Sequence, residues 1–243
     1  MLRSNSLQSL NDNPCYVAFD CEWTKNFRIK NGNRPFCFSL VAVPITSHLN
    51  EDLTFSLAYA YIDSLDEESD LVVEANCIVE QLLNRGHIFV GHQLSSDLAA
   101  LLNLVPNGIA PGLTAVREAW RTRRESGAEQ RVIDTRYDMS SLLRNKSRRL
   151  VDVCQELELL VTQPELGHAS MTALQRQFLQ SGKESLRERL QVMNIRHSLS
   201  TAILAMLADG KRFIGPINVN VILFNNLSLR FGYLQSPMFR ALL

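Results

Sequence analysis

The chain has 243 residues, of which 46% are hydrophobic and 21% are charged. These values are typical of an ordinary soluble globular protein with one large domain, or one domain with an added segment, and a substantial core. Because 25 basic residues balance 25 acidic ones, overall charge attraction to nucleic acid is excluded, and any such binding depends on local patches.

The cysteines and the hydropathy pattern indicate the compartment. Five cysteines are scattered along the chain, mostly in apolar runs, and no C-x-x-C pair indicates zinc. This favours reduced thiols in the core over a disulfide framework. The N-terminal residues are polar, and the longest apolar runs are too short to span a membrane. We therefore expect a cytoplasmic protein that does not interact with membranes.

The order of strands and helices predicts a mixed α/β fold. Residues 1–14 read as a mobile N-terminal arm, residues 15–210 as the main domain, and residues 211–243 as a C-terminal extension that forms either a hairpin or a docking segment. Three strands, a helix, a strand and a helix in succession favour a mixed sheet covered by helices. The predicted strands lie at residues 15–22, 36–44, 53–62, 87–91 and 132–135, and the helices at 69–85, from 95 onward, at 150–159, 171–179 and 185–208.

Two acids end the first predicted strand, within the sequence Phe19-Asp20-Cys21-Glu22-Trp23. Because side chains alternate along a strand, Asp20 and Glu22 point to the same side and can share one cation. Paired carboxylates suit oxygen-preferring ions such as Mg²⁺ or Mn²⁺. An Asp-x-Glu pair of this kind is also common at solvated strand ends, so other residues must converge on it before it indicates a metal site.

A third acid, Asp97, follows the buried strand at residues 87–91 in the sequence Gly91-His92-Gln93-Leu94-Ser95-Ser96-Asp97. A carboxylate in the first turn of the next helix lies near the sheet edge. Taken alone, it is explained by the favourable interaction of an acid with the positive end of the helix dipole.

The order of these motifs resembles the DEDD superfamily of 3′–5′ exonucleases, which includes the proofreading domains of polymerases. FDCEW is similar to the first motif of this family, and VGHQLSSDLAAL to the second, with Gln93 where Asn is commoner. VIDTR at residues 132–136 is similar to a less diagnostic strand. The resemblance covers about residues 15–208 and implies a ribonuclease H-like fold with a five-stranded sheet, three strands antiparallel and the following ones parallel, flanked by helices.

The resemblance also implies the chemistry. Two divalent ions, Mg²⁺ or Mn²⁺, held about 3.5–4 Å apart, activate a water and neutralise the leaving 3′ oxygen in such sites. By the same resemblance, Asp20 bridges both ions, Glu22 holds the ion beside the attacking water, and Asp97 helps to hold the other.

The third motif of the family is missing. It requires an Asp on a late helix, with a Tyr four residues before it or a His five residues before it. Thr201-Ala202 set the register, which places His197 at the Asp position and Met193 at the Tyr position. Three interpretations of His197 remain: a metal ligand or base of an altered site, a plain helix residue in a fold that has lost catalysis, or a register error in which another acid such as Asp209 completes the site.

Contacts with a single-stranded 3′ end would come from aromatic and basic side chains. Trp23 is placed to stack on a terminal base, although a core role fits it equally. The densest basic cluster is Arg144, Lys146, Arg148 and Arg149, which is either a phosphate track or a solvated loop. Arginines 117, 121, 123 and 124 around Trp120 favour a surface helix with salt bridges over a phosphate contact.

Two hypotheses of function follow. The first is a metal-dependent 3′–5′ exonuclease with Asp20, Glu22 and Asp97 as ligands, His197 in the altered fourth position and a lowered rate. The second is a catalytically silent exonuclease-like domain that binds nucleic acid or a protein partner, the latter through residues 211–243. A third hypothesis is an unrelated α/β protein in which the three acids never meet.

Overall fold

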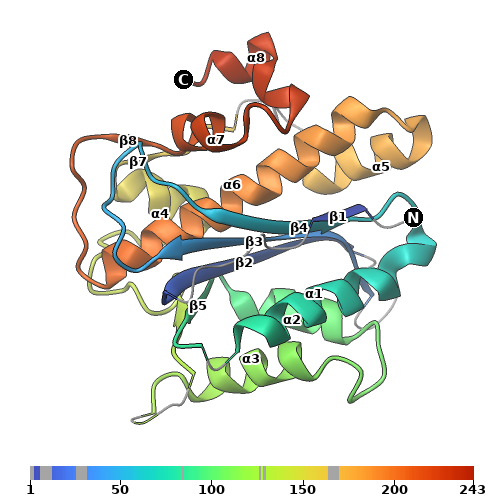
Figure 1. The fold of residues 1–243 in the computed structure, drawn as a ribbon, viewed down its shortest axis with the longest axis horizontal. Helices are drawn as coiled ribbons and strands as arrows, with labels where there is room; N and C mark the ends of the chain where they lie inside the picture. Colours follow the sequence, from blue (N-terminus) through green and yellow to red (C-terminus); the bar gives the residue numbers. More distant parts are fainter. Residues whose placement is uncertain are drawn as a thin grey trace.

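The structure is a computed structural model that describes residues 3–5, 13–25, 32–83, 85–125, 127, 130–163 and 170–243. Its centre is a mixed sheet with the strand order β1-β4-β3-β2-β5-β6 (Figure 1). The strands are β1 (Arg3–Asn5), β2 (Cys15–Lys25), β3 (Asn33–Pro44), β4 (Ser56–Tyr61), β5 (Ile88–Gly91) and β6 (Val132–Asp134).

The pairing of the strands confirms the predicted sheet. β2, β3 and β4 form an antiparallel meander, and β5 and β6 then add parallel to β2. This is the arrangement of a ribonuclease H-like sheet. The sequence did not predict β1, which pairs antiparallel with the edge of β4. The rest of the expected N-terminal arm, residues 1–2 and 6–12, lies outside the described residues.

Helices cover both faces of the sheet, as its two apolar faces require. One face carries α1, α2 and α3, whereas α6 crosses β2 and β3 on the other face, with α4 and α7 on the same side (Figure 1). The helices are η1 (Leu65–Glu67), α1 (Glu68–Leu82), α2 (Leu94–Leu102), α3 (Pro111–Thr122), α4 (Leu150–Glu156), α5 (Met171–Ser181), α6 (Glu184–Ala208), α7 (Val219–Leu227), η3 (Gly232–Gln235) and α8 (Pro237–Arg240).

The C-terminal segment is helical and packs onto α6. A short strand, β8 (Ile217–Asn218), pairs with β7 (Leu159–Leu160), and α7 follows it directly. Ile222, Phe231 and Phe239 are buried in the same hydrophobic cluster as the α6 side chains. Because α6 is enclosed by the sheet and by this segment, nearly all of its residues from Leu190 to Met206 are buried, polar ones included. Residues 217–243 thus form a short strand and helices packed on α6 rather than a hairpin.

Candidate functional site

Strand β2 carries both acids of the first motif to the face that α6 covers. Tyr16 and Ala18 lie in the cluster packed on α6, and alternation along the strand gives Asp20 and Glu22 the same direction. Asp20 is paired with Ser39 of β3, and Glu22 with Cys37. The register shifts after Glu22, so the two acids lie at the end of the regular part of the strand pairing.

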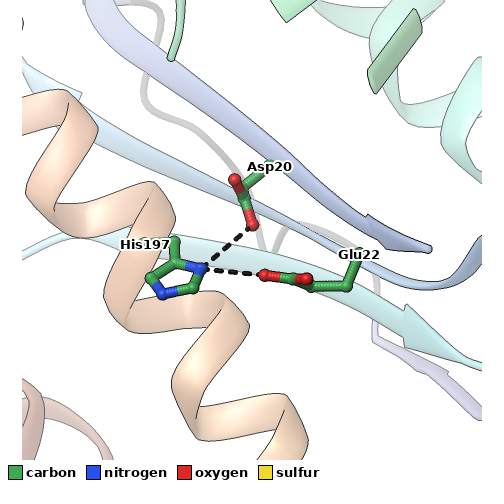
Figure 2. Close-up of side chains that lie close together, drawn as sticks. All are labelled: Asp20, Glu22 and His197. Atoms are coloured by element: carbon green, nitrogen blue, oxygen red, sulfur yellow. Dashed lines mark hydrogen bonds and ion pairs between the residues drawn. The ribbon is translucent and has the colours of Figure 1, made fainter. Parts of the chain in front are cut away.

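Helix α6 supplies the side chains that meet these acids. Asn194 and His197 are three residues apart and therefore lie on one side of the helix. Ser198 and Ser39 join their hydroxyl groups at 2.6 Å, and these small side chains allow α6 to approach β3 closely. The helix thus holds His197 directly over the two carboxylates (Figure 2).

Asp20, Glu22 and His197 form one compact cluster, in which one ligand atom from each lies within 4.8 Å of the others. His197 Nδ1 lies 2.9 Å from Glu22 Oε1 and 3.6 Å from Asp20 Oδ2 (Figure 2). Asn194 Nδ2 donates to Asp20 Oδ2 at 2.7 Å and fixes the orientation of that carboxylate. No sequence pattern indicated Asn194 beyond its position about one turn before His197.

The electrostatics of the cluster are those of a site prepared for positive charge. Burial, followed by the charge of Asp20, raises the pKa of Glu22, although the His197 hydrogen bond opposes this. Burial alone would lower the pKa of His197, but hydrogen bonds to Asp20 and Glu22 and their charges raise it to about 10. Without a metal ion, His197 is therefore an imidazolium at neutral pH and partly neutralises the two carboxylates.

Asp97 lies beside the cluster but not in it. The turn from β5 into α2 is tight, because a Cβ on Gly91 would lie 2.5 Å from Leu94 Cβ and Gln93 adopts a left-handed φ of 67°. This turn buries Asp97, whose Oδ1 accepts the Cys21 backbone N–H at 3.3 Å. Burial, with the charges of Asp20 and Glu22, raises its pKa well above the usual value. Asp97 is thus electrostatically linked to both acids, while its oxygens lie outside the ligand cluster.

The structure also shows where Met193 and Asp209 lie. Met193 is fully buried in the core, so it offers no group to the site. Asp209 accepts a hydrogen bond from Tyr16 at 2.9 Å and pairs with Arg131 near the other end of β2. Within the described ranges, the ligand cluster contains His197 and not Asp209.

A cleft of about 430 Å³ opens beside the cluster. Its wall includes Asp20, His197, His92 and Arg149. His92 Nε2 donates to the Arg148 carbonyl at 2.8 Å, so the basic loop predicted from the sequence is tied to the end of β5. Of that loop, Arg149 borders the cleft, where it also pairs with Asp152 at 2.7 Å.

The remaining residues proposed for nucleic-acid contact do not line this cleft. Arg144 and Lys146 are exposed, and Lys146 lines an adjoining hollow with Asp152 and Glu156. Trp23 is partly buried and packs against the hydrophobic cluster that contains Phe19 and Cys21. The loop therefore adjoins the cleft, whereas Trp23 contributes to the core.

The arginine-rich helix forms salt bridges, as its composition predicts. Arg123 and Arg124 both pair with Asp138, at 2.8 and 2.9 Å, and Arg121 pairs with Glu118 at 2.6 Å. These pairs support the interpretation of α3 as a surface helix.

Two carboxylates and one imidazole are a donor set that fits a divalent cation. Carboxylate oxygens suit Mg²⁺ and Mn²⁺ alike, whereas a nitrogen ligand favours Mn²⁺ or another transition metal. Asn194 Oδ1 is buried at the edge of the cluster without a hydrogen-bond partner and offers one more oxygen. In this conformation the described residues gather ligands for one ion, and Asp97 would have to turn to contribute to a second.

Comparisons with known proteins leave the site as the basis for any inference about function. No protein-family model matches the chain, and a search of curated proteins likewise finds no match. Among the described residues, no helix has both the length and the hydropathy that are needed to cross a bilayer.

Proposed function

We propose that the chain is a metal-dependent 3′–5′ exonuclease that hydrolyses phosphodiester bonds at nucleic-acid 3′ ends. The observation that carries this proposal is the convergence of Asp20, Glu22 and His197 from separate parts of the chain onto one cation-sized space beside a cleft. Five free cysteines support a reducing compartment, and we place the protein in the cytoplasm.

The chain's own residues have distinct roles in this proposal. Asp20, Glu22 and His197 would hold a divalent ion, Mn²⁺ or Mg²⁺, and Asp97 would contribute to a second one. When bound, such ions lower the pKa of water and stabilise the charge on the leaving 3′ oxygen. His197 has to release its proton before it can bind a metal through Nδ1. Asn194 keeps Asp20 in the orientation that points it at His197.

The altered third motif has a cost in rate. Met193 cannot accept a proton, and its side chain is enclosed in the core. Loss of a general base lowers rates by about 10²–10⁴. We therefore expect slow turnover in which Mn²⁺ supports more activity than Mg²⁺.

A second candidate function is a silent exonuclease-like domain that binds single-stranded nucleic acid or a protein partner. The His197 imidazolium favours it, because an internal cation already neutralises Asp20 and Glu22. In this case the basic loop beside the cleft would bind phosphates, and no metal would be needed.

Degradation of 3′-labelled single-stranded DNA and RNA, with Mg²⁺ or Mn²⁺, distinguishes the two functions. The variants are Asp20→Ala and His197→Asp, with the exposed Asp66→Ala as the matched control. Shortening from the labelled end by the wild type and by Asp66→Ala, but not by Asp20→Ala, would establish the exonuclease. His197→Asp should raise the Mg²⁺-dependent rate, because a carboxylate is a better ligand for Mg²⁺.

Absence of cleavage by the wild type, with none gained in His197→Asp, would overturn the exonuclease proposal. Retained binding of the same oligonucleotides would then favour the silent domain. Cleavage that persists in Asp20→Ala would assign the activity to another site or to a contaminant.

A further inference from the structure

A second cavity, of about 150 Å³, lies beside the first half of α6 and shares no lining residue with the cleft at the metal cluster. It is enclosed by β4, the first half of α6 and the segment before η3, and the residues that line it are Tyr59, Tyr61, Arg187, Glu188, Gln191, Arg230 and Phe231. Tyr59 and Asp20 are the neighbours of Ser39 on opposite strands. The cavity therefore involves β4, whereas the carboxylates lie on β2, with β3 between the two strands.

Gln191 is the unusual residue of this cavity. Its side chain is buried, with 3% of the residue exposed, yet neither Nε2 nor Oε1 has a hydrogen-bond partner. An unpaired buried amide is costly, so a native structure seldom leaves both of its atoms unsatisfied. The amide offers one donor and one acceptor side by side, which is the complement of a ligand edge that carries an acceptor next to a donor.

The side chains that line the cavity restrict the shape of a ligand that fits it. Tyr59, Tyr61 and Phe231 supply aromatic surface, and the Tyr59 and Phe231 rings lie 5.5 Å apart. A cavity of about 150 Å³ accommodates a single six-membered ring such as benzene. The space thus suits one flat ring and is small for two fused rings.

The charged side chains around the cavity have partners of their own. Arg187 pairs with Glu184 and lies 3.8 Å from Asp63. Glu188 accepts the Tyr233 backbone N–H at 2.9 Å, and the Arg230 guanidinium lies 5.1 Å from the centre of the Tyr59 ring. Because these charges are largely balanced, the cavity suits a neutral ring.

We propose that this cavity binds a pyrimidine base, with the Gln191 amide paired to the donor–acceptor edge of the ring. Cytosine and uracil are flat, neutral, single six-membered rings that carry a hydrogen-bond donor beside an acceptor. Aromatic side chains and amides are the groups by which proteins recognise unstacked bases. The base arrives either as a free nucleoside or within a single strand, and both sources present the same edge. This site is separate from the metal cluster and does not depend on the proposed hydrolysis.

NMR titration of the ¹⁵N-labelled protein in EDTA tests the proposal without involving the metal site. Cytidine, uridine, adenosine and a six-nucleotide oligouridylate are added in turn, and the Gln191 side-chain amide resonance is followed. We expect this resonance to shift with cytidine or uridine, and adenosine to bind at least about tenfold more weakly. Tighter binding of the oligouridylate than of uridine would identify the strand as the source, and equal binding the free nucleoside.

Gln191→Leu is the decisive variant, and Gln180→Leu, at an exposed position of α5, is its control. Leucine removes the unpaired amide, so the variant should fold with an unchanged or higher melting temperature and bind cytidine at least about tenfold more weakly. Unchanged binding in Gln191→Leu would overturn the proposal. So would equal affinity for adenosine, or the absence of any shift at millimolar nucleoside, which would leave ordered water as the only partner of the amide.

Discussion

Two acidic centres lie near the ends of β6 and β2, the strands on either side of β5, and their partners differ. Asp134, at the end of β6, accepts the backbone N–H groups of Gln93, Leu94 and Arg136 at 2.9, 3.1 and 3.1 Å and the Trp120 indole N–H at 2.7 Å. Among the described residues, Asp20 and Glu22, at the end of β2, are held by two side chains of α6, Asn194 and His197.

The hydrogen-bond partners of a carboxylate decide whether it stabilises the fold or can bind a metal ion. The partners of Asp134 are fixed backbone donors and one indole, so its charge holds together the start of α2, α3 and the end of β6. The partners of Asp20 and Glu22 include a titratable imidazole, which another cation can replace. A carboxylate whose hydrogen bonds come from fixed donors stabilises the fold. A carboxylate that pairs with a titratable side chain can exchange this partner for a metal ion.

The largest expected effect on stability concerns Asp134. Asp134→Ala leaves several buried donors without an acceptor, at about 1–3 kcal/mol for each, so the free energy of unfolding should fall by about 3–5 kcal/mol. Asp20→Ala, its matched control, leaves the Asn194 amide donor unpaired but relieves repulsion with Glu22, so it should cost about 1–2 kcal/mol. Urea denaturation in EDTA measures both, and equal losses would contradict the distinction between the two centres.

The next effect is the pH dependence of stability that arises from the cluster of Asp20, Glu22 and His197. The pKa of His197 is raised from its ordinary 6.5 to about 10, so the folded state keeps a proton that the unfolded chain loses above about pH 6.5. The stabilisation by this ion pair is fully present below pH 6.5 and is lost as the pH rises through 10. In EDTA, the free energy of unfolding of the wild type should therefore fall by up to about 4 kcal/mol more than that of His197→Gln between pH 6.5 and 10.

Urea midpoints across this pH range, compared between the two proteins, isolate His197 from the other groups that titrate there. Parallel curves would show that the imidazolium does not stabilise the pair of carboxylates. A wild type that gains stability toward high pH would reverse the sign and exclude the assigned protonation state.

The smallest effect concerns Asn194, which holds Asp20 from the next turn of α6. Loss of an outer hydrogen bond to a ligand typically weakens metal binding by about 10–100-fold. Asn194→Ala should therefore raise the dissociation constant for Mn²⁺ by about that factor, as measured by calorimetry. Asn226→Ala, which alters an amide of α7 remote from the cluster, serves as control, and equal affinities in the two variants would remove Asn194 from the site.

Most of the fold could be predicted because it depends on local patterns. Apolar alternation located β2, β3 and β4, and helical spacing located α1, α5 and α6, since burying one face imposes these periods. β1 was missed because three residues carry no periodic signal. The form of residues 211–243 stayed open because their apolar residues pack on α6, a partner that local sequence does not reveal.

For the candidate site, the sequence by itself determined that Asp20 and Glu22 share a face, because strand geometry alone requires it. Only the tertiary structure decided what these residues meet. It placed His197 and Asn194 against the two carboxylates, turned Asp97 to the Cys21 backbone and enclosed Gln191 in a separate cavity. Such contacts join residues up to 177 positions apart, between Asp20 and His197, and depend on how closely α6 packs on the sheet, which no local pattern encodes.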